Sequence, residues 1–141
     1  MSDPDASTPA GTPALDDETL AFARRMFDLA RAGDPELLAQ VDAGLPANLT
    51  NGEGSTLLLL AVYHGRDDLA QGLLERGADA QRINDRGQTA LAAAAFRGST
   101  RIARSLLDAG ADPRAGSPDA LETARFFEQH EVLTLLASRA D

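Results

Sequence analysis

A stretch in the middle of the chain recurs after 33 residues. The matches at this single offset are Gly54 with Gly87, Thr56 with Thr89, Leu58 with Leu91, Ala61 with Ala94, Gly65 with Gly98, Leu73-Leu74 with Leu106-Leu107, and Gly77-Ala78-Asp79 with Gly110-Ala111-Asp112. A fixed period of this length is typical of repeat architectures, in which each unit buries its apolar face only by stacking on its neighbours. We therefore expect a row of similar units rather than a single closed core.

Each unit is predicted to be a helix, a turn, a second helix and a glycine-led loop. Apolar residues in 55–63 recur at helical spacing, and Gly65 is expected to end that helix in a left-handed conformation. Asp67 or Asp68 is expected to cap the second helix, whose apolar face contains Leu69, Leu73 and Leu74. Gly77 then ends it, and a polar loop leads to the next unit.

The segments GSTLLLLAVYHG and GQTALAAAAFRG, each followed by Leu-Leu and Gly-Ala-Asp, resemble the ankyrin repeat pattern G-x-T-P-L-H-x-A-A. Leu57 and Ala90 replace the proline of that pattern, and Leu59 and Ala92 replace its histidine. The resemblance implies an all-α ankyrin-repeat solenoid of about four stacked helix-turn-helix units with short β-hairpin-like fingers. It also implies that the hydrogen-bond network usually built from the threonine and histidine is lost.

The flanking segments fit the same frame less closely. We place repeats at approximately residues 15–50, 51–83, 84–116 and 117–141, so that the ankyrin domain spans 15–141. The last repeat aligns at an offset of 30, with Glu128 at the position of the turn glycine. Residues 1–14, with three prolines, are predicted to be a disordered tail. The helix over 17–32 is expected to be longer than its counterparts, as in an N-terminal cap.

Composition and charge argue against several classes of function. A net charge of −9 disfavours binding to nucleic acid or to an anionic membrane. The chain has no signal-peptide pattern and no apolar run long enough to span a bilayer, so we expect a cytoplasmic protein without membrane contact. Cysteine is absent, which excludes disulfides and thiolate metal sites. Every basic residue is arginine, which indicates a GC-rich bacterial genome.

Catalytic motifs are not apparent. His64 and His130 are the two histidines, and neither has a second set of ligands nearby in the sequence. The chain contains neither a nucleophile elbow nor a phosphate-binding loop. We therefore expect no enzyme activity, no metal and no cofactor. The alternative of a hydrolase using His64 would require loss of activity in His64→Ala.

The resemblance implies protein binding through the finger tips and through the concave face of the first helices. Tyr63, Phe96 and Phe126 each lie two residues before the turn glycine or its equivalent, so they are predicted to form an aromatic ladder. Such a ladder with an arginine rim would suit a partner with apolar and acidic groups. The other candidate contact residues are His64, Glu53, Arg82, Arg86 and Arg97.

The alternative is that these rings pack between repeats and compensate for the small, alanine-rich helices. Of the three, Tyr63 is expected to be the most exposed and Phe126 the least. The neighbouring Phe127 is expected to be buried.

The sequence thus predicts a monomeric, non-enzymatic module that binds a cytoplasmic partner protein. Two further interpretations remain open. An immunity or inhibitor protein could use its acidic surface to attract a basic toxin or enzyme quickly. A self-associating scaffold could dock the aromatic ladder on a second copy of the chain.

Overall fold

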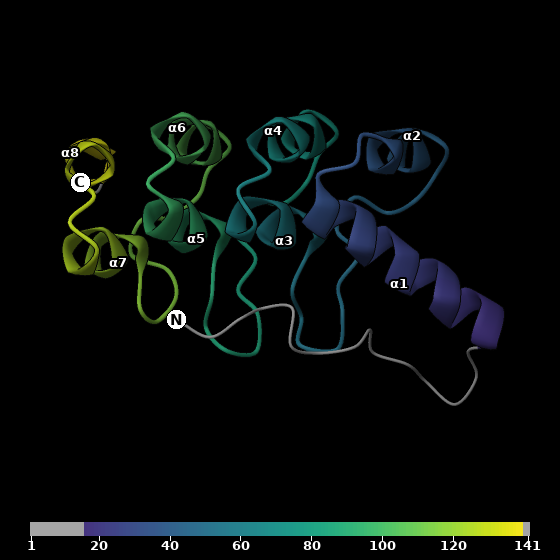
Figure 1. Ribbon diagram of the computed structural model, residues 1–141. Helices are drawn as coiled ribbons and strands as arrows, with labels where there is room; N and C mark the ends of the chain where they lie inside the picture. The colour runs from purple at the N-terminus through teal and green to yellow at the C-terminus, as the bar shows by residue number, and fades with distance from the viewer. Residues whose placement is uncertain (1–15, 140–141) are drawn as a thin grey trace.

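The computed structural model describes residues 16–139, which contain eight α-helices. Consecutive helices contact each other in four pairs, and Figure 1 shows these pairs side by side in a row. Their bounds are α1 Asp17–Ala32, α2 Glu36–Asp42, α3 Leu57–Tyr63, α4 Asp67–Glu75, α5 Ala90–Arg97, α6 Thr100–Asp108, α7 Ala120–Phe126 and α8 His130–Arg139. The predicted all-α repeat solenoid is confirmed, and α1 is the longest helix, as expected. The tail proposed for residues 1–14 lies outside the described residues.

The helices form two layers. The odd-numbered helices pack in sequence from α1 through α3 and α5 to α7, and the even-numbered helices pack in sequence from α2 to α8. Loops project from the odd-numbered layer on the side away from the even-numbered helices (Figure 1). No helix within residues 16–139 has the length and apolar character needed to cross a membrane.

The core lies mainly in the odd-numbered layer. All residues of α3 from Leu57 to Val62 are buried, and so are all residues of α5 from Ala90 to Ala95. These helices are flanked by a neighbour on each side and are covered by the second layer. A helix that is apolar on every side is stable only when it is enclosed in this way. The alanines of α5 give it a small diameter, which suits close packing between α3 and α7.

The threonines of the repeat pattern keep a structural role. The hydroxyl of Thr56 accepts a hydrogen bond from the amide of Leu59, and the hydroxyl of Thr89 accepts one from the amide of Ala92, each at 3.0 Å. Each threonine is therefore the N-cap of its helix. The threonine thus keeps a capping hydrogen bond in both repeats although the histidine of the pattern is replaced.

The second helix of the second repeat begins differently from the prediction. Arg66 is the N-cap of α4 and makes no side-chain capping bond, so neither aspartate caps the helix. Asp67 instead accepts a hydrogen bond from the Ser99 hydroxyl at 2.7 Å, and Asp68 forms a salt bridge with Arg101 at 2.8 Å. These carboxylates connect α4 to the next repeat.

The left-handed conformation predicted at Gly65 is confirmed, and the equivalent turns share it. Gly33, Gly65 and Gly98 have φ between 71° and 74°. Glu128, at the equivalent position of the last repeat, adopts φ 55° and is the one non-glycine residue with positive φ among the described residues. The fold therefore imposes the same turn on a residue that favours it much less.

Two buried asparagines organise the fingers. The side chain of Asn51 accepts hydrogen bonds from the amides of Glu53 and Ser55, and Asn84 repeats this arrangement 33 residues later. Isolated β-bridges join Thr50 to Thr56 and Ile83 to Thr89, so these fingers are hairpin-like. The Asn84 amide group also donates to the Ser55 hydroxyl at 3.0 Å, which links neighbouring fingers.

Candidate functional site

Aromatic side chains from three consecutive repeats form a continuous row. The rings of Tyr63 and Phe96 are stacked with centroids 5.8 Å apart and an interplanar angle of 20°. Phe96 meets Phe127 edge to face at 5.0 Å, and Phe127 meets Phe126 in the same way at 4.9 Å. These separations lie within the range of favourable aromatic pairs. We call Tyr63, Phe96, Phe127 and Phe126 the aromatic row.

The row differs from the predicted ladder at its end. Phe127, not Phe126, contacts the ring of the preceding repeat. Phe127 is 39% exposed rather than buried, and Phe126 is 81% exposed rather than the least exposed member. The reason is local. The helix α7 ends at Phe126, and Phe127 is its C-cap residue, so the two rings leave the backbone in different directions.

Tyr63 and Phe96 combine features of the two predicted alternatives, an exposed binding ladder and rings packed between repeats. Each is partly buried, and each packs against a ring of the following repeat. Such rings contribute to repeat packing and also keep part of their surface in contact with solvent. His64 continues the row at the other end, since its ring lies 5.5 Å from that of Tyr63.

Arg97 lies beside the row. Its guanidinium group covers Gly65, where an added Cβ would lie 2.6 Å from Nη2. Arg97 is exposed and forms no salt bridge with any residue in 16–139. The methylene carbons of Arg66 cover Gly33, and its Nε donates to the carbonyl oxygen of Arg31 at 2.8 Å. The sequence analysis did not select Arg66, although its spacing of 33 residues from Gly33 is the repeat period.

Arg82 and Arg86, the other two arginines predicted to contact a partner, lie in the finger that joins the second and third repeats. Arg86 donates to the Glu53 carboxylate of the preceding finger at 2.6 Å, so this predicted pair of contact residues forms a bond between fingers. Arg82 lies 3.4 Å from the Asp79 carboxylate. Between them, Ile83 is 50% exposed. These polar contacts connect both arginines to other finger residues.

An apolar hollow adjoins the end of the row. It has a volume of about 440 Å³ and is lined by Pro118, Glu122, Thr123, Phe126 and Phe127. The finger before α7 is three residues shorter than the equivalent finger before α5. The amide of Ser117 in this short finger donates to the carbonyl oxygen of Gly87 at 2.9 Å. The short finger therefore lies against its predecessor.

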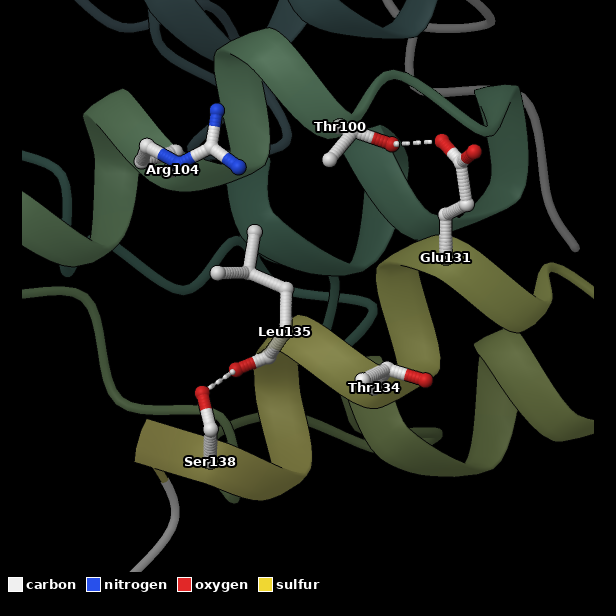
Figure 2. Close-up of a pocket in the computed structure, with 6 residues that line it drawn as sticks. All are labelled: Thr100, Arg104, Glu131, Thr134, Leu135 and Ser138. Carbon is white, nitrogen blue, oxygen red and sulfur yellow. Dashed lines mark hydrogen bonds between the residues drawn. The ribbon is translucent and has the colours of Figure 1, made fainter.

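A second hollow lies in the other helix layer, between α6 and α8 (Figure 2). Its volume is about 470 Å³, and its lining residues are Thr100, Arg104, Glu131, Thr134, Leu135 and Ser138. The hydroxyls of Thr134 and Ser138 donate to backbone carbonyl oxygens of their own helix at 3.0 and 2.7 Å. Hydroxyls engaged in this way are not arranged as nucleophiles, because no base accepts their protons. This hollow offers mixed polar contacts.

The described residues show no arrangement typical of a metal site. No group of three or more histidine, aspartate and glutamate side chains within 16–139 is placed to hold a metal ion. His64 is the C-cap of α3, and His130 begins α8.

Stacked helix pairs, capping threonines, left-handed turn glycines and hairpin fingers define a helical-repeat protein. A family model described as ankyrin repeats (3 copies) matches residues 26–117, and the chain belongs to the ankyrin repeat family. Over 62 residues it is 48% identical to the Pseudomonas aeruginosa protein named "Putative ankyrin repeat protein PA3287". That match covers 43% of this chain and 36% of the relative, so it spans little more than a third of the relative's length. Ankyrin repeats are generally protein–protein interaction modules, and the family is typically non-enzymatic.

Proposed function

We propose that this protein is a non-enzymatic binding module that holds a partner protein against the aromatic row. The observation that supports this is the row itself, in which partly exposed rings from three consecutive repeats touch one another. Aromatic side chains bury much apolar area at a small cost in conformational entropy, and for that reason they are common at binding hot spots. Contact across repeats also holds the rings in place before a partner arrives.

The charge beside the row indicates the chemistry of the partner. Arg97 is exposed and has no salt-bridge partner within the described residues. An arginine next to aromatic rings favours a partner surface that combines an apolar side chain with a carboxylate, because guanidinium groups bind carboxylates in a bidentate manner. The fingers around Ile83, which is 50% exposed, supply further apolar contact.

The test begins by capturing partners from an extract of the native type of cell. Each captured protein is then purified, and its affinity is measured directly. We expect Phe96→Ala/Phe127→Ala to weaken binding about 30-fold or more, as loss of hot-spot rings does. Phe22→Ala is the matched control, because Phe22 is a 44% exposed ring on α1 outside the row. It should leave the affinity unchanged.

Unfolding by urea separates binding from packing. The double variant loses the Tyr63–Phe96 and Phe96–Phe127 ring contacts, each worth about 0.5–1.5 kcal/mol beyond buried area. Affinities are therefore compared at a urea concentration where all variants are fully folded. If the variant is less stable but binds a purified partner as tightly as the wild type, the row serves repeat packing alone and the proposal fails.

A further inference from the structure

The end of the solenoid at α7 presents a face that is covered in the preceding repeat. The helix α5 packs against α3 and α7, and its residues Ala92 and Ala95 are 1% and 0% exposed. Thirty residues later, Glu122 and Arg125 occupy these positions in α7 and both are exposed. Such a position is buried in a helix that has a neighbour on each side, and it is exposed in the last helix of the row. It therefore lies on the side of the helix where a further helix would pack. Glu122 and Arg125 therefore mark the outer stacking face of the last repeat, whose helix α7 lies at the end of the row of odd-numbered helices (Figure 1).

Phe126 lies at the edge of this face. Its equivalents Tyr63 and Phe96 are each covered by a ring of the following repeat, Phe96 and Phe127 respectively. Phe126 has only Phe127 from the end of its own helix, and it is 81% exposed. The apolar hollow of about 440 Å³ next to it is lined by both Phe126 and Glu122. The ring is thus placed to be covered by one more packing partner.

The two charges on this face are opposite and unmatched. Glu122 uses one carboxylate oxygen to accept from the amide of Asp119 at 3.2 Å, which completes the capping box of α7. Neither Glu122 nor Arg125 forms a salt bridge with the described residues. They are three residues apart and therefore share one side of the helix.

We propose that a second copy of this chain covers this face, with α7 packed antiparallel against α7 of the second copy across a twofold axis. In a twofold interface each residue meets its counterpart in reversed order. Glu122 of one copy then lies opposite Arg125 of the other, and the pair occurs twice. The exposed Phe126 rings enter the interface next to these pairs. Self-complementary charge is thus the feature that selects a second copy over another partner.

The opposite end of the row is less suited to this contact. On α1, Arg25 forms a salt bridge with Glu36, and Asp28 forms one with Arg31. These charges are already matched within the chain. Docking of the α7 face on α1 of another copy would also be a head-to-tail contact, which generates filaments unless the rotation closes a ring. The α7 face is therefore expected to produce a closed dimer.

This dimer goes beyond the proposed partner binding and differs from the monomer expected from the sequence. Sedimentation velocity measures the monomer–dimer equilibrium of the full chain at about 150 mM salt, over protein concentrations from about 1 μM to 1 mM. The wild type should pass from monomer to dimer with no larger species. Phe126→Ser should shift the transition to higher concentration, and Phe22→Ser at the other end should leave it unchanged.

Charge reversal provides the decisive comparison. Arg125→Glu places two acidic pairs across the twofold axis, and Glu122→Arg places two basic pairs there. Each variant alone should dimerise with a dissociation constant raised about tenfold or more, since two attractive exposed pairs become repulsive. An equimolar mixture of the two variants restores both opposite-charge pairs, so it should form a heterodimer with the affinity of the wild type.

The mixture also controls for folding, because a misfolded variant would not regain association. A wild type that stays monomeric throughout this range, or that grows beyond a dimer, overturns the proposal. So does a mixture that associates no better than its components. Tyr63 lies in the second repeat, far along the row from this face. A Tyr63→Ala variant that dimerises normally but loses the partner protein separates failure of this proposal from failure of the binding function.

Discussion

The turn at Glu128 provides a sharp test of how the repeat geometry constrains the last unit. This residue adopts φ 55° where the preceding repeats have glycine at φ 71–74°. The geometry is fixed by the amide of Gln129, which donates to the carbonyl oxygen of Ala124 at 2.9 Å, just as Ser99 donates to Ala94 one repeat earlier. Glu128→Gly should therefore stabilise the protein while leaving the fold unchanged.

The magnitude follows from two opposing effects. A left-handed conformation costs a non-glycine residue about 1–2 kcal/mol. Glycine loses more backbone entropy on folding, which costs about 0.5–1 kcal/mol. The Glu128 side chain is exposed and makes no salt bridge within the described residues, so its loss removes little. The net gain should be about 0.5–1 kcal/mol, which corresponds to a rise in Tm of about 2–5 °C for a chain of this size.

Urea unfolding followed by circular dichroism measures this difference. Glu128→Ala is the first control, because alanine keeps the strain and should give no gain. Glu131→Gly, in the first turn of α8, is the second control and should lower stability by about 1 kcal/mol. If Glu128→Gly is no more stable than the wild type, then the turn is not strained in the folded protein. The argument from repeat geometry would then be refuted.

Three further changes probe the same scaffold. Gly65→Ala should lower the free energy of unfolding by about 1–2 kcal/mol, because the residue has φ 74°. The loss should exceed that of Gly77→Ala, because only at Gly65 must the guanidinium group of Arg97 move away from the new Cβ. Urea unfolding of both variants measures the difference. Thr89→Ala should cost about 1 kcal/mol through loss of the α5 cap, whereas Thr89→Ser should cost much less. Hydrogen bonds from the side chain and then the backbone amide of Thr19 hold the pKa of Asp16 below its ordinary value of 3.8. This carboxylate therefore stabilises the fold above that pH and ceases to do so as the pH falls through its lower folded pKa. The stability difference between wild type and Asp16→Ala, measured at a series of pH values, should therefore shrink in acid.

Much of the fold could be predicted because the repeat period is a global property of the sequence. The 33-residue offset predicted the order of helices and the left-handed turn at Gly65 without any knowledge of contacts, and weaker matches in the flanks predicted about four units. The start of α4 was harder to predict, because Asp67 is a good capping residue that forms its hydrogen bond with Ser99 of the next repeat instead. The buried Asn51 and Asn84 were missed although they obey the period, since asparagine in a loop is usually exposed.

The candidate site could be predicted only in part, because contacts between repeats depend on side-chain direction. The sequence position of Phe126 matches that of Phe96, yet Phe127 provides the contact with the preceding repeat. A single residue of offset at a helix end rotates a side chain by about 100° and so decides which ring meets its neighbour. Similarly, Arg86 was expected at a binding rim, but its partner Glu53 lies one period earlier and pairs with it.

In the proposed function, the aromatic row serves stability and recognition through the same side chains. Between Tyr63 and Phe127 each ring packs against the next repeat, which supports the coupling between units on which a solenoid depends. The alanines of α5 leave Phe96 as the one large apolar side chain of that helix near its turn. A ring there both fills the space between repeats and reaches the surface. Substitutions in the row should therefore change repeat coupling and partner affinity together, whereas Arg97, which covers a turn glycine from outside, should affect affinity with little loss of coupling.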